Sequence, residues 1–123
     1  LSLAENLLYP LIIRGDTVFS QKAKLKQILA QFDLFSKRDE KASHLGRNHQ
    51  ILAMLARAVI ADQPLLLIDE PFDRLNREMA AIIPDTLRRL SAAGHTIIIL
   101  TADHSGLDMP NVSKYQIKGG SLQ

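Results

Sequence analysis

The stretch Leu65-Leu66-Leu67-Ile68-Asp69-Glu70-Pro71 decides the fold of this chain. Its short apolar run ends abruptly in two carboxylates and a proline, which predicts a strand buried on both faces of a parallel sheet. Open parallel sheets bind ligands at the carboxyl ends of their strands. Asp69 could therefore orient Mg²⁺, directly or through water, and Glu70 could polarise an attacking water. The competing interpretation is a buried strand whose acids only cap the next turn.

The rest of the chain alternates helical and strand patterns, which predicts an α/β fold with a parallel sheet. A second buried strand is expected over 97–100, closed by the polar residues Thr101 to His104. Helices are expected over 20–32 and 49–61 and after a cap at Asn76, the last with a kink or break at Pro84 and an end at Gly94. The remaining expectations are a helix ended by Pro10, a turn at 14–16, a loop over 35–48, a weak strand over 112–117 and a turn at 119–120.

The composition is that of an ordinary globular domain. The chain has 123 residues, 46% hydrophobic and 23% charged, which suits one domain with one core. A net charge of +2 gives no argument for nucleic acid, and the lack of cysteine excludes disulfides and thiolate metal sites. No apolar stretch approaches the ~20 residues that span a bilayer, and no signal peptide is evident. Because the chain begins at Leu1, we expect it to be an internal piece of something longer, although processing would also explain that start.

Several motifs together resemble the ATP-binding-cassette (ABC) ATPases of ABC transporters. Ala56-Arg57-Ala58 stands at the family's usual spacing ahead of Asp69, and Asp62-Gln63-Pro64 leads into the run that matches the Walker B strand and its catalytic glutamate. Gly94-His95-Thr96 and the strand after it match the approach to the family's switch loop. The segment from Glu5 to Leu11 resembles the start of the helical subdomain, which in transporters lies near the membrane subunit.

The resemblance implies part of a P-loop NTPase fold, with parallel strands flanked by helices. Residues 1–48 would be a helical-subdomain portion with the signature loop, and residues 49–123 would be the C-terminal part of the ATPase core. The phosphate loop G-x-x-x-x-G-K-[ST], which the family places upstream of these motifs, is absent from the sequence. We therefore expect ATP and Mg²⁺ to be cofactors of the full-length protein, and this chain alone to bind ATP poorly and to be inactive.

The signature loop departs from the family pattern Leu-Ser-Gly-Gly-Gln. This chain offers Leu45-Gly46-Arg47-Asn48-His49 in its place. The family uses this loop to contact the terminal phosphate of ATP held by the partner subunit, which would make Gly46, Arg47, Asn48 and His49 cofactor-binding residues. Arg47 could replace backbone contacts with a charge contact to phosphate. Alternatively, the loop has decayed and only caps a helix.

Two further loops depart from the family pattern. Asp73-Arg74-Leu75-Asn76 replaces Ser-Ala-Leu-Asp, so the final carboxylate of a loop that contacts the opposite subunit has become an amide. In the switch loop, Ala102 stands where the family places histidine after Thr101. His104 lies two residues further on, and it is a candidate catalytic residue only if the loop bulges. Otherwise His104 is simply a solvated loop residue.

The leading hypothesis is a nucleotide-binding subunit of an ABC transporter. The resemblance implies Asp69 as the Mg²⁺ residue through water, Glu70 as general base, a second nucleotide-binding subunit and a transmembrane permease. It also implies a cytoplasmic location, peripheral to the membrane through the permease. The alternatives are a weak or inactive scaffold that dimerises, and a soluble ABC ATPase that acts on nucleic acid or ribosomes, for which the charge gives no basic stripe. Exposed strand edges also predict association of the isolated chain.

Overall fold

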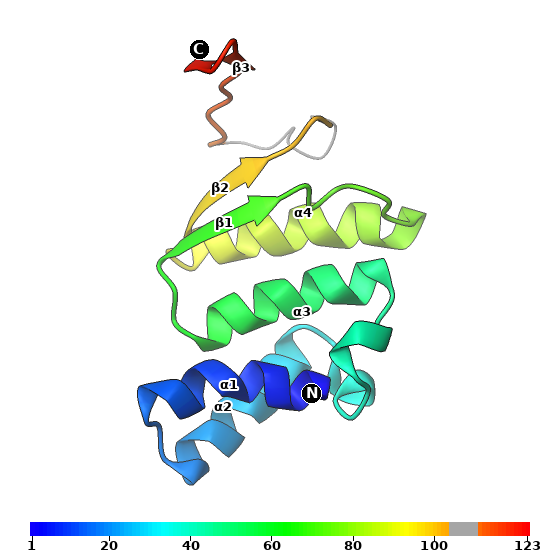
Figure 1. Cartoon of the computed structure of the whole chain (residues 1–123), viewed down its shortest axis with the longest axis vertical. Coiled ribbons are helices and arrows are strands. Elements are labelled where there is room, and N and C mark those ends of the chain that lie inside the picture. Colours follow the sequence, from blue (N-terminus) through cyan, green and yellow to red (C-terminus); the bar gives the residue numbers. More distant parts are fainter. Residues whose placement is uncertain (104–110) are drawn as a thin grey trace.

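A computed structural model describes residues 1–103 and 111–123, and it arranges them as helices stacked on one side of a small parallel sheet (Figure 1). In chain order, the helices and strands are α1 (Leu3–Arg14), α2 (Val18–Gln31), α3 (Arg47–Ile60), β1 (Leu65–Asp69), α4 (Arg77–Ala92), β2 (Thr96–Leu100), β3 (Ile117–Lys118) and β4 (Ser121–Leu122). Short 3₁₀ turns at Phe35–Lys37 and Ala42–His44 interrupt the loop before α3. Helices α2 and α3 each begin two residues earlier than the sequence pattern predicts.

Strands β1 and β2 pair in parallel, as predicted, with Leu65 opposite Thr96 and Asp69 opposite Leu100. Helix α4 connects them. The prediction that both strands are buried on both faces is wrong for the described residues. Leu66 and Ile68 point into the core, whereas Leu67 is 69% exposed and Ile98 is 49% exposed on the opposite face. The helices pack on one side of the sheet, so alternate residues of each strand remain uncovered.

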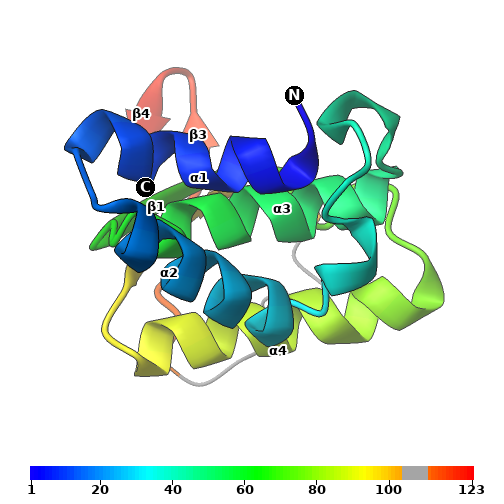
Figure 2. The ribbon, with the colours of Figure 1, turned by 90° about the horizontal axis from the view of Figure 1, so that it is seen from below.

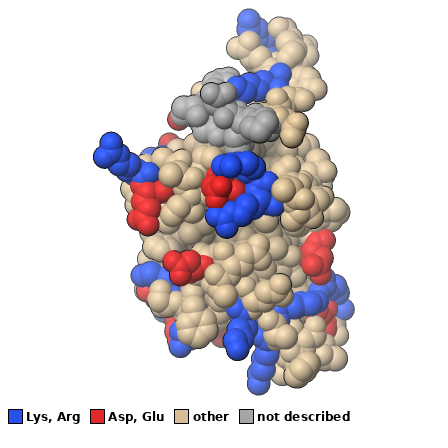
Figure 3. Space-filling view, turned by 180° about the vertical axis from the view of Figure 1, so that it is seen from behind, with Lys and Arg blue, Asp and Glu red and all other residues tan. Residues whose placement is uncertain are grey.

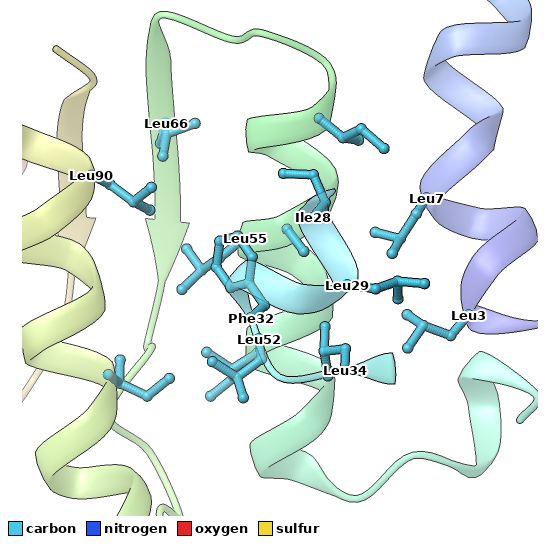
Figure 4. Packing of buried hydrophobic residues seen from close by; sticks show 14 of the residues in the cluster. Leu3, Leu7, Ile28, Leu29, Phe32, Leu34, Leu52, Leu55, Leu66 and Leu90 are labelled. Carbon is cyan, nitrogen blue, oxygen red and sulfur yellow. The ribbon is translucent and has the colours of Figure 1, made fainter. Parts of the chain in front are cut away.

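One continuous core joins the three layers of the chain. Helix α3 lies in the middle, between α1 and α2 on one side and β1 with α4 on the other (Figures 1 and 2). The close view shows how Leu55 and Phe32 meet near the centre, with Leu66 and Leu90 on the sheet side (Figure 4). Because α3 contributes to both sides of this core, its packing fixes where its first turn lies. The division into residues 1–48 and 49–123 remains a prediction.

Helix α1 continues through Pro10, which contradicts the prediction that proline ends it. It begins at a capping box between Ser2 and Glu5 and ends at Gly15, whose φ of 84° is left-handed. Proline removes one backbone hydrogen bond and costs about 3 kcal/mol in a helix interior. Leu3, Leu7 and Leu11 are all buried on one face, and this stripe continues beyond the proline. Burial of each leucine contributes about 1.5–3 kcal/mol, which offsets the lost bond.

The later elements confirm some predictions and correct others. Asn76 caps α4, with its Oδ1 accepting from the backbone N–H of Met79 at 2.8 Å. Helix α4 runs as one element past Pro84, so the predicted division does not occur, and Ile83 and Leu87 on either side of the proline are buried. The predicted strand over 112–117 is largely wrong. Only Ile117–Lys118 forms strand, paired antiparallel with Ser121–Leu122 across the predicted 119–120 turn.

An ion cluster fixes the turn between α1 and α2. Arg14 donates to both oxygens of Asp16, at 2.7 and 2.9 Å, and Lys24 bonds the same carboxylate at 2.8 Å. Arg14 also reaches Asp62 after α3 at 3.1 Å. The hydrogen bonds from Arg14, with those from Lys24, hold the pKa of Asp16 well below its usual range. The cluster therefore ties the α1–α2 turn to the end of α3.

Replacing Asp16 with asparagine is expected to lower the thermal unfolding midpoint at pH 7. Because the pKa of Asp16 is lower in the folded state, its stabilisation is fully present above the unfolded pKa of about 3.9 and is lost as the pH falls through the folded value. The difference from wild type should therefore shrink below about pH 4. Thermal unfolding from pH 7 to pH 2 measures this. Asp39→Asn, at a side chain that is 84% exposed, is the control, and a constant difference at every pH would contradict the assignment.

Candidate functional site

The carboxyl ends of β1 and β2 bring the candidate acids next to the residues that follow β2. Asp69 is the last residue of β1 and lies opposite Leu100. The next residue, Glu70, continues the ladder because its N–H donates to the carbonyl of Leu100 at 2.8 Å. Thr101 and Ala102 therefore lie directly beside Glu70. The two strand ends thus meet at the edge of the sheet where the sequence predicts a site.

Each polar group of Glu70 has a partner. One carboxylate oxygen accepts from the hydroxyl of Thr101 at 3.1 Å, and the other accepts from the N–H of Ala102 at 3.1 Å. Its carbonyl accepts from Arg47 Nη2 at 2.9 Å and from the N–H of Asp73 at 3.3 Å. The Thr101 hydroxyl in turn accepts from the N–H of Asp103 at 3.0 Å. Glu70 is thus oriented at its N–H, its carbonyl and its carboxylate.

Asp69 is exposed at the end of β1, on the open face of the sheet. Among the described residues, no side chain or backbone N–H donates to its carboxylate. Those residues also contain no group of three or more histidine, cysteine, aspartate or glutamate side chains that could hold a metal. Mg²⁺ is commonly held by one or two carboxylates together with water and substrate phosphates. The single exposed carboxylate of Asp69 fits that kind of site and not a cage built from protein ligands.

The loop that joins β1 to α4 contains two strained positions. Glu70 has a φ of 49° and Arg74 has a φ of 56°, both in the left-handed region that ordinary side chains avoid. Such positions cost about 1–3 kcal/mol each and persist where the surroundings fix them. An open cleft of about 540 Å³ lies over this loop, lined by Glu70, Phe72, Asp73, Arg74, Ala102 and Asp103. A ligand in this cleft would contact the Glu70 carboxylate from the open side.

The predicted signature segment forms the start of α3. Gly46 is the N-cap, and a Cβ atom at this position would meet nothing within 4 Å. The side chain of Asn48 accepts from the backbone N–H of Asn76 at 3.4 Å. Arg47 turns toward Glu70, and its Nε is buried without a hydrogen-bond partner in the described residues. An unsatisfied buried donor costs about 1–3 kcal/mol, so Arg47 is held there by its other contacts.

The sequence missed the two contacts that organise this site. It identified Ala102 as a departure because alanine lacks a hydrogen-bonding side chain, but the backbone N–H of Ala102 binds Glu70. It assigned Arg47 either to a phosphate or to no role, but the side chain binds the Glu70 carbonyl. The polar end of the second strand was the available signal for Thr101, whereas the Arg47 contact had none. His104 lies outside the described residues, and His49 is half-buried in the first turn of α3.

Comparison with known proteins identifies the family. No family model matches the chain. The chain is 31% identical over 103 residues to the macrolide export ATP-binding/permease protein MacB of Campylobacter jejuni, covering 84% of this chain and 16% of that protein. It is 30% identical over 106 residues to the lipoprotein-releasing system ATP-binding protein LolD of Chromohalobacter salexigens, covering 86% and 45%. The chain belongs to the ABC ATPase family.

The solved structures agree with this assignment at the level of the fold. A nucleotide-free ATP-binding cassette from an ABC transporter matches 87% of this chain with a TM-score of 0.71 and 21% identity, and the match covers 47% of that cassette. An ATP-binding cassette in its ADP conformation matches 80% of this chain with a TM-score of 0.62 and 23% identity, covering 44% of that cassette. The predicted P-loop NTPase fold is therefore confirmed. The chain spans less than half the length of these ABC relatives.

Proposed function

We propose that this chain is part of a Mg²⁺-dependent ATPase that drives an ABC transporter. It supplies the hydrolytic edge, which is the edge of the sheet where β1 and β2 end and which carries Asp69, Glu70 and Thr101. The observation that carries the proposal is the position of the Glu70 carboxylate. It lies at the ends of two parallel strands, is bonded by Thr101 and Ala102, and lines an open cleft. The similarity to MacB and LolD, both described as ATP-binding, supports the same function. This chain contributes no phosphate loop to the cleft, because its sequence lacks that motif. ATP binding therefore requires residues from outside the printed sequence.

Two acids of this edge have distinct roles in the proposed reaction. Asp69 holds Mg²⁺ through water, because its carboxylate is exposed and has no protein donor in the described residues. When bound, the cation neutralises charge on the phosphates and positions them. Glu70 positions the attacking water and accepts its proton as general base. The bonds from Thr101 and Ala102 fix the direction of the Glu70 carboxylate before ATP arrives, and its remaining lone pairs can still accept from water.

The start of α3 suits the role of the signature loop. The first backbone N–H groups of a helix have no partner within the helix, and the helix dipole favours an anion there. No side-chain cap satisfies the start of α3, and Gly46 leaves open space. We propose that the backbone of Gly46, Asn48 and His49 faces the ATP of a second nucleotide-binding subunit. The side chain of Arg47 is directed into its own chain.

The α1–α2 turn offers a surface for the permease. Ile12, Ile13 and Phe19 are 54%, 70% and 86% exposed, which is unusual for neighbouring large apolar side chains. The sequence resemblance placed this contact near Glu5 to Leu11, but Leu7 and Leu11 of that segment are buried in the core. We therefore propose that the membrane subunit contacts the exposed turn, which would hold the protein at the cytoplasmic face of the membrane. Within the described residues, the helices lack the length and apolar character needed to cross a bilayer.

The inactive-scaffold alternative has one observation in its favour. Arg47 stands where the family has glycine, and its side chain fills space beside the Glu70 loop. ATP binding without turnover in the natural gene product would support this alternative. The surface gives less support to an ATPase that acts on nucleic acid. On the described part of the face in Figure 3, lysine and arginine gather in small groups beside aspartate and glutamate, not in a continuous stripe.

Replacing Asp69 with asparagine is expected to raise the Mg²⁺ concentration that gives half-maximal ATP hydrolysis by about tenfold, because a carboxylate that orients metal-bound water is lost. The measurement is a Mg²⁺ titration of ATP hydrolysis by the natural full-length gene product. Asp39→Asn, at an 84% exposed carboxylate that pairs with Arg38 at 3.5 Å and does not line the cleft, is the control. An unchanged Mg²⁺ requirement in the Asp69 variant would remove Asp69 from the metal site.

A further inference from the structure

Arg47 connects the start of α3 to the backbone of Glu70. Its Nη2 donates to the Glu70 carbonyl at 2.9 Å, and its Nε is buried. Both atoms are therefore directed into the chain that carries them. The family pattern has glycine at this position, and glycine has no side chain that could make such a bond. The contact is thus a property of this sequence and not of the family motif.

The loop that Arg47 contacts requires support from outside itself. Glu70 and Arg74 both have left-handed φ values, which non-glycine residues hold only where neighbours fix them. Arg47 binds the first residue of this loop, and Asn48 accepts from the backbone N–H of Asn76 at its end. Two consecutive residues of α3 therefore hold both ends of the loop. Helix α3 is itself fixed in the centre of the core.

We propose that Arg47 is a positioning residue that fixes the Glu70 backbone, and through it the direction of the Glu70 carboxylate. In the present orientation of the Glu70 backbone, the carboxylate bonds to both Thr101 and Ala102. The Arg47 bond restrains that orientation from the opposite side. This inference rests on the proposed function, in which Glu70 acts on the attacking water. The Arg47 side chain of the altered signature loop then acts on Glu70 of its own subunit, while the loop backbone faces the partner's ATP.

A contact between Arg47 and the phosphate of the partner's ATP predicts different behaviour. To reach outward, the guanidinium would have to leave the Glu70 carbonyl and the buried position of its Nε. The phosphate contact would strengthen ATP binding. The Glu70 contact would instead affect the rate of the chemical step, and it would order the loop between β1 and α4 even in the nucleotide-free protein. The two roles are therefore separable by experiment.

The first test is amide hydrogen exchange on the nucleotide-free natural gene product. Arg47→Met keeps the aliphatic packing but removes the donors. We expect exchange at the amides of Asp73 and Ala102 to rise about tenfold, because both bond to Glu70. Arg47→Lys, which keeps a charged donor group, should restore most of the protection. Arg57→Met, at an exposed position on the same helix, is the matched control and should change neither amide. Unchanged exchange in Arg47→Met would overturn the proposal.

The second test is the steady-state kinetics of the same variants. We expect Arg47→Met to lower kcat about tenfold with little change in KM for ATP, and to add no further loss when combined with Glu70→Gln. A raised KM with unchanged kcat, or fully additive losses, would overturn the proposal in favour of a phosphate contact. Absence of turnover in the wild type would contradict the proposed function. In that case, the exchange experiment still decides whether Arg47 fixes Glu70.

Discussion

Replacing Glu70 with glutamine is expected to slow ATP hydrolysis by about 100-fold or more while ATP remains bound. Glutamine has nearly the same shape as glutamate, and its amide oxygen can still accept one of the bonds from Thr101 and Ala102. It cannot accept a proton from water. The variant should therefore retain its fold and accumulate ATP. Phosphate release and retained nucleotide, measured on the natural full-length gene product with Mg²⁺, report the two effects separately.

Glu78→Gln is the matched control for this prediction. Glu78 lies in the first turn of α4, is exposed, and undergoes the same change of charge and shape. Its turnover should remain close to that of the wild type. Full turnover in the Glu70 variant would sink the assignment of Glu70 as general base. If wild type and both variants all bind ATP without turnover, the scaffold alternative replaces the ATPase.

The features that the sequence predicts well are those fixed by short-range chemistry. The apolar run that ends at Asp69 forms β1, and its parallel pairing with β2 follows from the helix between them. The Asn76 cap and the turn at 14–16 also lie where their local chemistry requires. Because the ends of parallel neighbours share one edge, the position of Glu70 beside Thr101 could be inferred in outline. The site is therefore predictable to the level of which strand ends meet.

The features that the sequence did not predict depend on what surrounds each element. Local preference predicts a break at Pro10, but burial of Leu11 beyond it keeps α1 intact. An apolar strand predicts cover on both faces, yet cover depends on which elements are present to pack there. The Arg47 bond to Glu70 joins residues far apart in the chain, at a position where the family pattern has glycine. No local pattern or family comparison could have indicated it.

Replacing Leu55 with alanine is expected to destabilise the fold by about 2–5 kcal/mol, because it removes a large buried side chain and the surrounding core relaxes only partially around the gap. Leu55 is 1% exposed and lies on α3, the helix that joins the two sides of the core (Figure 4). The measurement is urea unfolding of the natural gene product. Met54→Ala, at the preceding residue, which is 43% exposed, should cost far less.

Since α3 also carries Arg47, the Leu55 variant should loosen the Glu70 loop before global unfolding, with faster amide exchange at Asp73. Equal losses in the two variants would show that α3 is not the centre of the core.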